Sequence, residues 1–178
     1  SYHGRMPQTA HSPQHSASAP ALALTIAGSE ATGGAGAQAD LKTFQELGVF
    51  GIVALTCIVS FDPEDDWNHR FFPVPTEILQ QQLDAIQGDY PERLRTVKLG
   101  MQGSPEVIRT SAAALRRAEW DHVVLDPVLI CKGQEPGHAL DTDQALKAEL
   151  LPLATFTTPN HFETEQLSGM TVRSVEDP

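Results

Sequence analysis

The chain has 178 residues, which suits a single domain, and its formal net charge is −11 because 23 Asp and Glu oppose 12 Lys and Arg. An acidic chain without a run of basic residues is a poor candidate for binding nucleic acid or an anionic membrane. The longest nearly apolar run, residues 49–61, is too short to span a bilayer. Two cysteines, Cys57 and Cys131, are too few for a disulfide framework, so we expect a cytoplasmic protein.

The first residues differ in composition from the rest of the chain. Residues 1–21 are rich in Pro, Ser, Gln and His and contain almost no large aliphatic side chains. Such a segment cannot bury enough apolar surface to offset the entropy lost on ordering it. We therefore divide the chain into a disordered or extraneous tail over residues 1–21 and a folded part over residues 22–178.

From residue 22 onwards, strand and helix signals alternate along the chain. The expected strands cover residues 21–28, 50–61, 67–74, 95–101, 122–130 and 155–160, and the expected helices cover residues 37–47, 76–88, 104–118, 141–154 and 161–169. This alternation predicts an α/β fold with a mostly parallel central sheet and helices on both faces. The turn at residues 63–66 joins two strands and predicts a small hairpin flap.

Individual residues mark the ends of the expected helices. Thr76 and Ser104 are expected N-caps, whereas Gly48 and Gly88 are expected to end helices. The strand over residues 50–61 is so apolar that we expect it to be buried on both faces.

A loop rich in glycine follows the first strand and contains Gly28, Gly33, Gly34 and Gly36. A phosphate-binding P-loop needs Lys and then Ser or Thr after its second glycine, and neither is present. A dinucleotide fingerprint fits residues 34–39 but begins too far from the strand, so an NAD-dependent oxidoreductase is the last of the alternatives. The loop is therefore expected to hold a small ligand at the carboxyl end of a strand.

Four segments, in the same order as in the family, resemble the hydroxymethylpyrimidine kinase and pyridoxal kinase branch of the ribokinase superfamily. They are "ALTIAGSEATGGAGAQADLKTFQELGVFG", "KLGM", "VVLDPVLICKG" and "LLPLATFTTPNHFETEQLSG", and the resemblance runs from about residue 22 to residue 169. It implies a ribokinase-like fold and transfer of the ATP γ-phosphoryl group to a hydroxymethyl group on a small nitrogen heterocycle, with Mg²⁺. We expect a homodimer. The family's catalytic base lies in a C-terminal "GTGC"-type segment that this sequence lacks, so residues 22–178 would be the N-terminal part of the kinase domain.

The resemblance assigns the glycine loop to the acceptor ring rather than to the nucleotide. By analogy, Gly28, Ala35 and Gly36 would line the vitamin site, and Met101 would pack nearby. Glu30 is also a candidate substrate-binding residue. It stands where the family commonly has Asp, and the extra methylene leaves its contact open.

The resemblance assigns three polar residues to the other substrate. Asp126 of the "DPV" segment, and Asn160 and Glu163 of the "TPNHFE" segment, would arrange Mg²⁺ and the ATP phosphates. Oxygen ligands suit Mg²⁺, and phosphoryl transfer depends on positioning and charge neutralisation. From the residues alone, helix capping by Asn160 and a favourable first-turn charge at Glu163 are the simpler interpretation.

Phe61 bears on the choice of acceptor. Pyrimidine kinases of the family usually carry Gln at this position, and a phenyl ring leaves the aminopyrimidine unpaired, at a cost of about 1–3 kcal/mol. The "DPEDDWNH" segment also resembles pyridoxal kinases of this branch. We therefore expect a kinase for pyridoxal, pyridoxine and pyridoxamine. Hydroxymethylpyrimidine or its phosphate as the acceptor, and a fragment that only binds the vitamer, remain alternatives, as does an ordinary core role for Phe61 in the flap.

The two cysteines are interpreted differently. Cys131 precedes Lys132, and a neighbouring ammonium group lowers the pKa of a thiol, so Cys131 is a candidate for reversible addition to the aldehyde of pyridoxal. A small buried apolar role for Cys131 is an equal alternative. Cys57 is expected in the core, and His69 on the flap is expected to be exposed, although within reach of the site.

Overall fold

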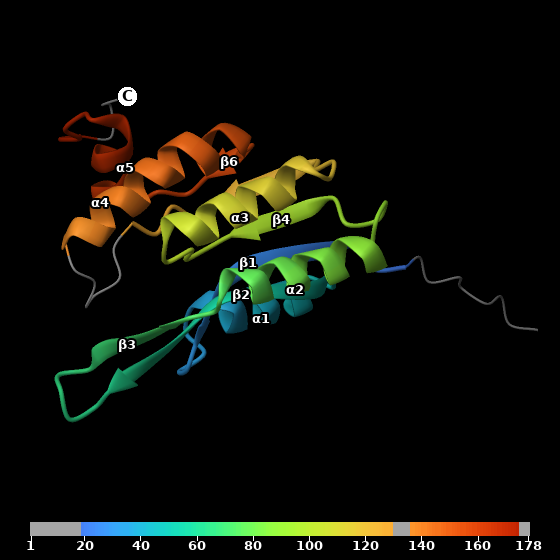
Figure 1. The fold of residues 1–178 in the computed structure, drawn as a ribbon, viewed down its shortest axis with the longest axis horizontal. Helices are drawn as coiled ribbons and strands as arrows, with labels where there is room; N and C mark the ends of the chain where they lie inside the picture. The colour runs from blue at the N-terminus through green and yellow to red at the C-terminus, as the bar shows by residue number, and fades with distance from the viewer. Residues whose placement is uncertain (1–18, 130–135, 175–178) are drawn as a thin grey trace, which may run out of the picture.

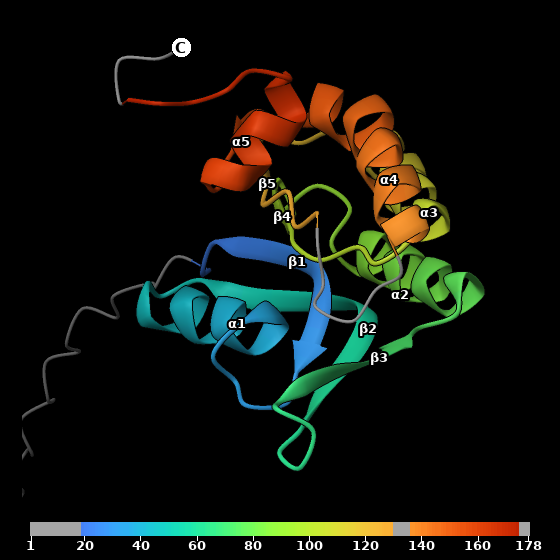
Figure 2. The same ribbon diagram turned by 90° about the vertical axis from the view of Figure 1, so that its left-hand side faces the viewer.

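The computed structural model describes residues 19–129 and 136–174 of the chain. Its centre is a six-stranded sheet in the order β3-β2-β1-β4-β5-β6 (Figures 1 and 2). Strand β3 is antiparallel to β2, and the other neighbouring strands run parallel. The predicted α/β fold with a hairpin flap is confirmed.

The elements follow the order expected from the sequence. The strands are β1 (Leu22–Glu30), β2 (Phe50–Asp62), β3 (Asn68–Pro73), β4 (Thr96–Leu99), β5 (His122–Leu125) and β6 (Phe156–Thr157). The helices are α1 (Gly36–Glu46), α2 (Thr76–Asp89), α3 (Pro105–Arg116), α4 (Pro136–Ala145) and α5 (His161–Ser168). None of the helices in the described ranges is both long and apolar enough to cross a membrane.

The helix expected over residues 141–154 is divided into three parts. Helix α4 is followed by a π-helical turn at Leu146–Leu150 and a 3₁₀ turn at Leu151–Leu153. Pro152 lies at the start of the 3₁₀ turn, and because proline has no N–H it cannot continue the regular helical hydrogen bonds.

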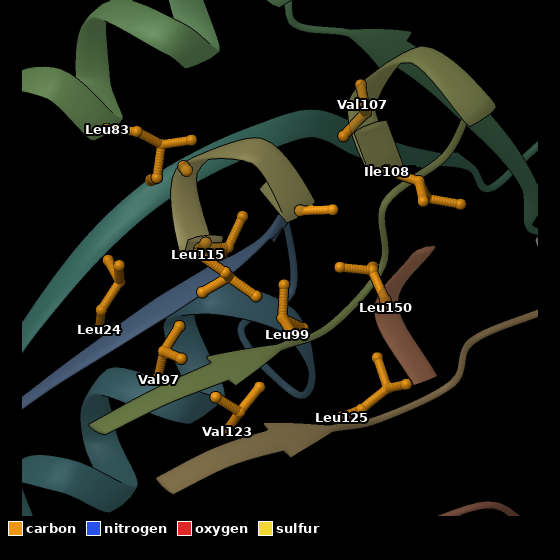
Figure 3. Packing of buried hydrophobic residues seen from close by; sticks show 14 of the residues in the cluster. Leu24, Leu83, Val97, Leu99, Val107, Ile108, Leu115, Val123, Leu125 and Leu150 are labelled. Atoms are coloured by element: carbon orange, nitrogen blue, oxygen red, sulfur yellow. The ribbon is translucent and has the colours of Figure 1, made fainter. Parts of the chain in front are cut away.

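The main hydrophobic core lies between the sheet and helices α2 and α3. Figure 3 shows apolar side chains of β1, β4 and β5 meeting those of the two helices, and the labelled residues include Leu24, Leu83, Val97, Leu99, Ile108, Leu115, Val123 and Leu125. Burial of each large aliphatic side chain contributes about 1.5–3 kcal/mol to folding. This core fixes the three central strands, whose carboxyl ends carry the candidate site.

Strand β2 is not buried on both faces along its length, so that prediction was wrong. Phe50 and Ile58 are 51% and 50% exposed, whereas Thr56 and Cys57 are fully buried. The second half of β2 pairs with β3 in a hairpin that extends beyond the helices (Figure 1). Side chains on its outer face therefore have no helix over them.

The helix ends agree with the sequence at Ser104 and Gly48 but not at α2. The Ser104 side chain accepts a hydrogen bond from the Val107 N–H at 3.3 Å, and Gly48 follows α1 with a φ of +72°. Helix α2 begins at Thr76 itself, so Pro75 holds the N-cap position, and its ring has no oxygen that could accept a capping hydrogen bond. Gly88 lies inside α2 rather than ending it.

Replacing Ser104 with Ala removes the acceptor that caps α3. We expect the free energy of unfolding to fall by about 1 kcal/mol, measured by urea denaturation. Gln81→Ala, on the exposed face of α2, is the control and should change stability by less than about 0.5 kcal/mol. Equal losses in the two variants would contradict a capping role.

Candidate functional site

A cavity of about 390 Å³ lies at the carboxyl end of β1, between the glycine loop, the flap and the ends of β4 and β5. The residues singled out from the sequence that line it are Gly28, Glu30, Ala35, Gly36, Phe61, Met101 and Asp126. Asn160 and Glu163 are not among the lining residues, and Cys131 lies outside the described residues. The carboxyl edge of a parallel sheet is where open α/β folds bind ligands.

Backbone atoms form much of the cavity wall beside the glycine loop. Strand β1 has an irregular register between Ala27 and Ser29, as often occurs next to binding sites. A Cβ atom on Gly36 would lie 2.4 Å from the carbonyl oxygen of Gly28, and Gly36 has a φ of +61°. A Cβ atom on Gly28 would lie 2.6 Å from Cys57 Sγ. A side chain at either position would clash, so glycine allows the loop, β1 and Cys57 to pack closely where both glycines line the cavity.

The Glu30 carboxylate organises the glycine loop. Its Oε1 accepts a hydrogen bond from the Thr32 N–H at 2.7 Å, and its Oε2 accepts from the Thr32 hydroxyl at 2.9 Å. The same Oε2 accepts from the N–H groups of Gly34 and Ala35 at 2.9 and 3.2 Å. These bonds, above all the one from the Thr32 hydroxyl, hold the pKa of Glu30 below its usual value. The longer side chain therefore reaches the loop's own donors.

Cys57 lies in the core, as predicted, and its sulfur lies close to both Gly28 and Met101. Its Sγ is 3.7 Å from Met101 Sδ, and burial raises the pKa of the thiol. Met101 is fixed in turn because its carbonyl oxygen accepts a hydrogen bond from the Thr56 hydroxyl at 2.7 Å. The Cys57 thiol is thus a packing group rather than a reactive one.

Two rings from the flap form the opposite wall. Phe61 and His69 are directly opposite each other on β2 and β3, and their ring centroids are 4.7 Å apart in an edge-to-face arrangement. His69 is partly buried, so the expectation of an exposed residue was wrong. Its Nδ1 is buried and has no hydrogen-bond partner among the described residues. The flap therefore presents a largely aromatic surface to the cavity.

Charged groups gather where β4 and β5 end. Lys98 Nζ lies 3.0 Å from Asp40 Oδ2 and 3.8 Å from Asp126 Oδ2. Burial raises the pKa of Asp126, the Lys98 ammonium opposes that shift, and Asp40 adds to it. The sequence does not single out Lys98 or Asp40. The feature of the sequence that could have identified Lys98 is a lysine inside an otherwise apolar strand, just before Gly100 and Met101.

Asn160 and Glu163 form a capping box at the start of α5. Asn160 Oδ1 accepts a hydrogen bond from the Glu163 N–H at 2.9 Å, and Glu163 Oε2 accepts from the Asn160 N–H at 2.8 Å. Gly169 ends the helix in a left-handed conformation. The capping interpretation is confirmed, and a contact of this pair with ATP phosphates stays a prediction.

The donor set fits a Mg²⁺ ion that is held jointly with a phosphate ligand. Within the described part of the chain, no group of three or more His, Cys, Asp or Glu side chains is arranged to hold a metal ion. Mg²⁺ is usually bound by one or two carboxylates together with substrate phosphates and water. Asp126 suits that kind of site, because its side chain lines the cavity and is 38% exposed.

The mostly parallel sheet, its antiparallel flap and the glycine-lined cavity at the carboxyl edge place the fold in the ribokinase-like class, which the similar solved kinases share. The chain belongs to the phosphomethylpyrimidine kinase family, whose model matches residues 30–178. The resemblance seen in the sequence is therefore confirmed.

The chain is similar to relatives that are named after two different phosphoryl acceptors. It is 46% identical over 160 residues to a pyridoxine kinase of Bacillus subtilis (strain 168), an alignment that covers 87% of the chain and 57% of the relative. It is 42% identical over 149 residues to a hydroxymethylpyrimidine/phosphomethylpyrimidine kinase of Haemophilus influenzae, covering 84% and 54%.

A solved relative shows the same fold. The pyridoxal kinase from Staphylococcus aureus in complex with AMP-PCP and pyridoxal superposes with a TM-score of 0.78 at 41% sequence identity. The match covers 89% of this chain and 55% of the relative. The chain thus spans about half the length of the curated relatives that it matches.

Removing the charge of Glu30 should make stability less dependent on pH. The folded-state pKa of Glu30 lies below the usual value for a glutamate, so the carboxylate stabilises the fold above that usual value. This contribution is lost as the pH falls through the lowered pKa. Between about pH 6 and pH 3, Glu30→Gln should therefore lose less unfolding free energy than the wild type in urea titrations. Glu46→Gln, at the exposed end of α1, should keep the wild-type profile. Identical profiles for the wild type and Glu30→Gln would refute the anchoring role.

Proposed function

We propose that the protein containing this chain is a Mg²⁺- and ATP-dependent kinase that phosphorylates the hydroxymethyl group of pyridoxal, pyridoxine and pyridoxamine. The observation that carries this proposal is the Phe61–His69 ring pair in the cavity wall, because it offers an apolar face to a methylated pyridine ring. The pyridoxine kinase of Bacillus subtilis and the pyridoxal complex of the Staphylococcus aureus enzyme support the same acceptor.

In this proposal one end of the cavity binds the acceptor ring and the other end binds Mg²⁺ and the ATP phosphates. Gly28, Ala35 and Gly36 would hold the acceptor ring against the main chain, with Met101 beside it and Phe61 over it. This arrangement excludes water from the ring and orients the hydroxymethyl group, and such positioning supplies much of the rate in phosphoryl transfer.

Asp126 would hold Mg²⁺ at the other end, and the ion, when bound, would neutralise charge on the ATP phosphates. Asn160 and Glu163 would order the start of α5 near the same phosphates, where the positive end of a helix favours anions. ATP as the donor is supported by the AMP-PCP complex of the Staphylococcus aureus relative.

A homodimer in the cytoplasm belongs to the same proposal. Ile58 and Phe72 are opposite each other on the outer face of the flap and are 50% and 56% exposed. Paired exposed apolar side chains on a hairpin suit contact with a second copy. Two cysteines without a disulfide framework suit a reducing compartment.

A second candidate function is phosphorylation of hydroxymethylpyrimidine or its phosphate. The matched family model and the Haemophilus influenzae relative both favour it. The two functions share the fold, the glycine loop and the nucleotide, so the acceptor side of the cavity must separate them.

Phe61→Gln in the full-length protein is the experiment that separates them. A buried amide beside pyridoxal lacks a partner, whereas beside an aminopyrimidine it gains both a donor and an acceptor. The ratio of kcat/KM for pyridoxal to that for hydroxymethylpyrimidine should therefore fall by about tenfold, or about 1.4 kcal/mol. Phe72→Gln, on the outer face of the same hairpin, should leave the ratio unchanged. Equal effects of Phe61→Gln on both acceptors would mean that Phe61 only supports the flap.

Asp126→Asn and Glu163→Gln test the phosphate end in the full-length protein. Each should lower turnover and raise the Mg²⁺ concentration needed for half-maximal rate, with little change in pyridoxal binding measured by absorbance titration. Asp121→Asn, at the other end of β5, is the matched control and should leave both quantities at wild-type values. Wild-type turnover of both variants at low Mg²⁺ would show that the assignment is wrong.

A further inference from the structure

Lys98 lines the cavity. Neither the sequence nor the names of the similar kinases assign it a role. It projects from β4, and its side chain is 21% exposed. Its Nζ lies between two carboxylates, 3.0 Å from Asp40 Oδ2 and 3.8 Å from Asp126 Oδ2. The shorter distance is that of a charge-assisted hydrogen bond, and the longer one is that of an ion pair without a hydrogen bond.

Asp40 is itself held in place from behind. Its side chain is 17% exposed and does not line the cavity. The hydroxyl of Thr25, which is fully buried in β1, donates a hydrogen bond to the same Oδ2 at 2.6 Å. Asp40 lies on α1, one turn after Gly36, so the contacts join β1, α1, β4 and the end of β5.

The Lys98 ammonium group lies between two carboxylates, and one of them is more exposed than the other. A partly buried ammonium group needs an anionic partner, and Asp40 supplies the nearer one. Asp126 has the more exposed side chain, 38% against 17% for Asp40, and it is the one that faces the cavity. A cation that arrives in the cavity therefore meets Asp126 and must compete with Lys98 for it.

We propose that Lys98 is an internal counter-cation for Asp126 and that Asp40 limits how strongly Lys98 competes with the divalent cation. The inference rests on the proposed function, which assigns that cation to Asp126. When the cation is absent, Lys98 balances the Asp126 charge. When it is present, Asp40 keeps Lys98 at the back of the cavity and neutralises it. Lys98 and Asp40 are thus positioning residues that act through Asp126.

The test is a double-mutant cycle on Mn²⁺ affinity in the full-length protein with saturating AMP-PCP, with free Mn²⁺ measured by electron paramagnetic resonance. Lys98→Met, or Lys98→Gln if the first does not fold, should tighten Mn²⁺ binding by about threefold or more because the competitor is gone. Asp40→Asn should weaken binding by about threefold or more, because Lys98 loses its nearer partner and pairs with Asp126.

The double variant decides between competition and a simple sum of charges. If Asp40 acts through Lys98, the double variant should bind Mn²⁺ within about twofold of Lys98→Met. If the two effects add, the double variant returns to the wild-type affinity and the proposal is overturned. Lys98→Arg keeps the charge and should stay within about twofold of the wild type.

A second partly buried lysine pair provides the matched control. Lys147 Nζ lies 3.1 Å from Asp143 Oδ2, and neither residue lines the cavity. Lys147→Met and Asp143→Asn should leave Mn²⁺ affinity unchanged, and a change like that of Lys98→Met would refute a specific role. Every variant should bind pyridoxal within about threefold of the wild type by absorbance titration, since Lys98 is not assigned to the ring.

Asp126→Asn separates this proposal from the proposed function. If Asp126→Asn leaves Mn²⁺ affinity unchanged, the assignment of the cation to Asp126 fails, and the proposal falls with it. If Asp126→Asn weakens Mn²⁺ binding but neither Lys98→Met nor Lys98→Gln tightens it, only the counter-cation role is overturned.

Discussion

The hydrogen bonds from the glycine loop to the Glu30 carboxylate are the interaction on which the rest of the site depends. The loop has almost no side chains with which to hold its own shape, and Ala35, at the N-cap of α1, makes no side-chain capping bond. Glu30 accepts from the N–H groups of Gly34 and Ala35, which are exposed and would otherwise bond only to water, and so ties the loop to the end of β1. A residue at the end of β1 thereby fixes where α1 begins, and with it the position of Asp40.

Parallel topology brings two chemically different walls to one cavity. The end of β1 and the flap contribute backbone and aromatic surface, whereas the ends of β4 and β5 contribute Lys98 and Asp126. These segments are far apart in sequence. They become neighbours because the crossover connections bring the carboxyl ends of the parallel strands to one edge of the sheet, and the β2–β3 hairpin continues from that edge. The proposed acceptor ring would therefore lie against the first wall and the proposed phosphoryl donor against the second.

The sequence predicts those parts of this structure that depend on local chemistry. Ser104 with the following proline, the hairpin turn and the capping box at Asn160 all follow from neighbouring residues. What the sequence could not supply depends on register between strands. The meeting of Lys98 with Asp40 requires β4 to lie beside β1 in one alignment, and no local pattern encodes that. The exposure of Ile58 similarly depends on how far the helices reach along the sheet.

Because successive side chains of a strand point to opposite faces, the flap has an inward set that lines the cavity and an outward set that does not. Phe61 pairs with His69 on the cavity side, whereas Ile58 pairs with Phe72 on the outside. A substitution in the inward set can therefore change the cavity wall without altering the outward set. A one-residue insertion within either strand would exchange the two sets, whereas one in the turn at residues 63–66 would leave them in place. Lineages of this family should accordingly vary in the length of the turn and conserve the length of the strands.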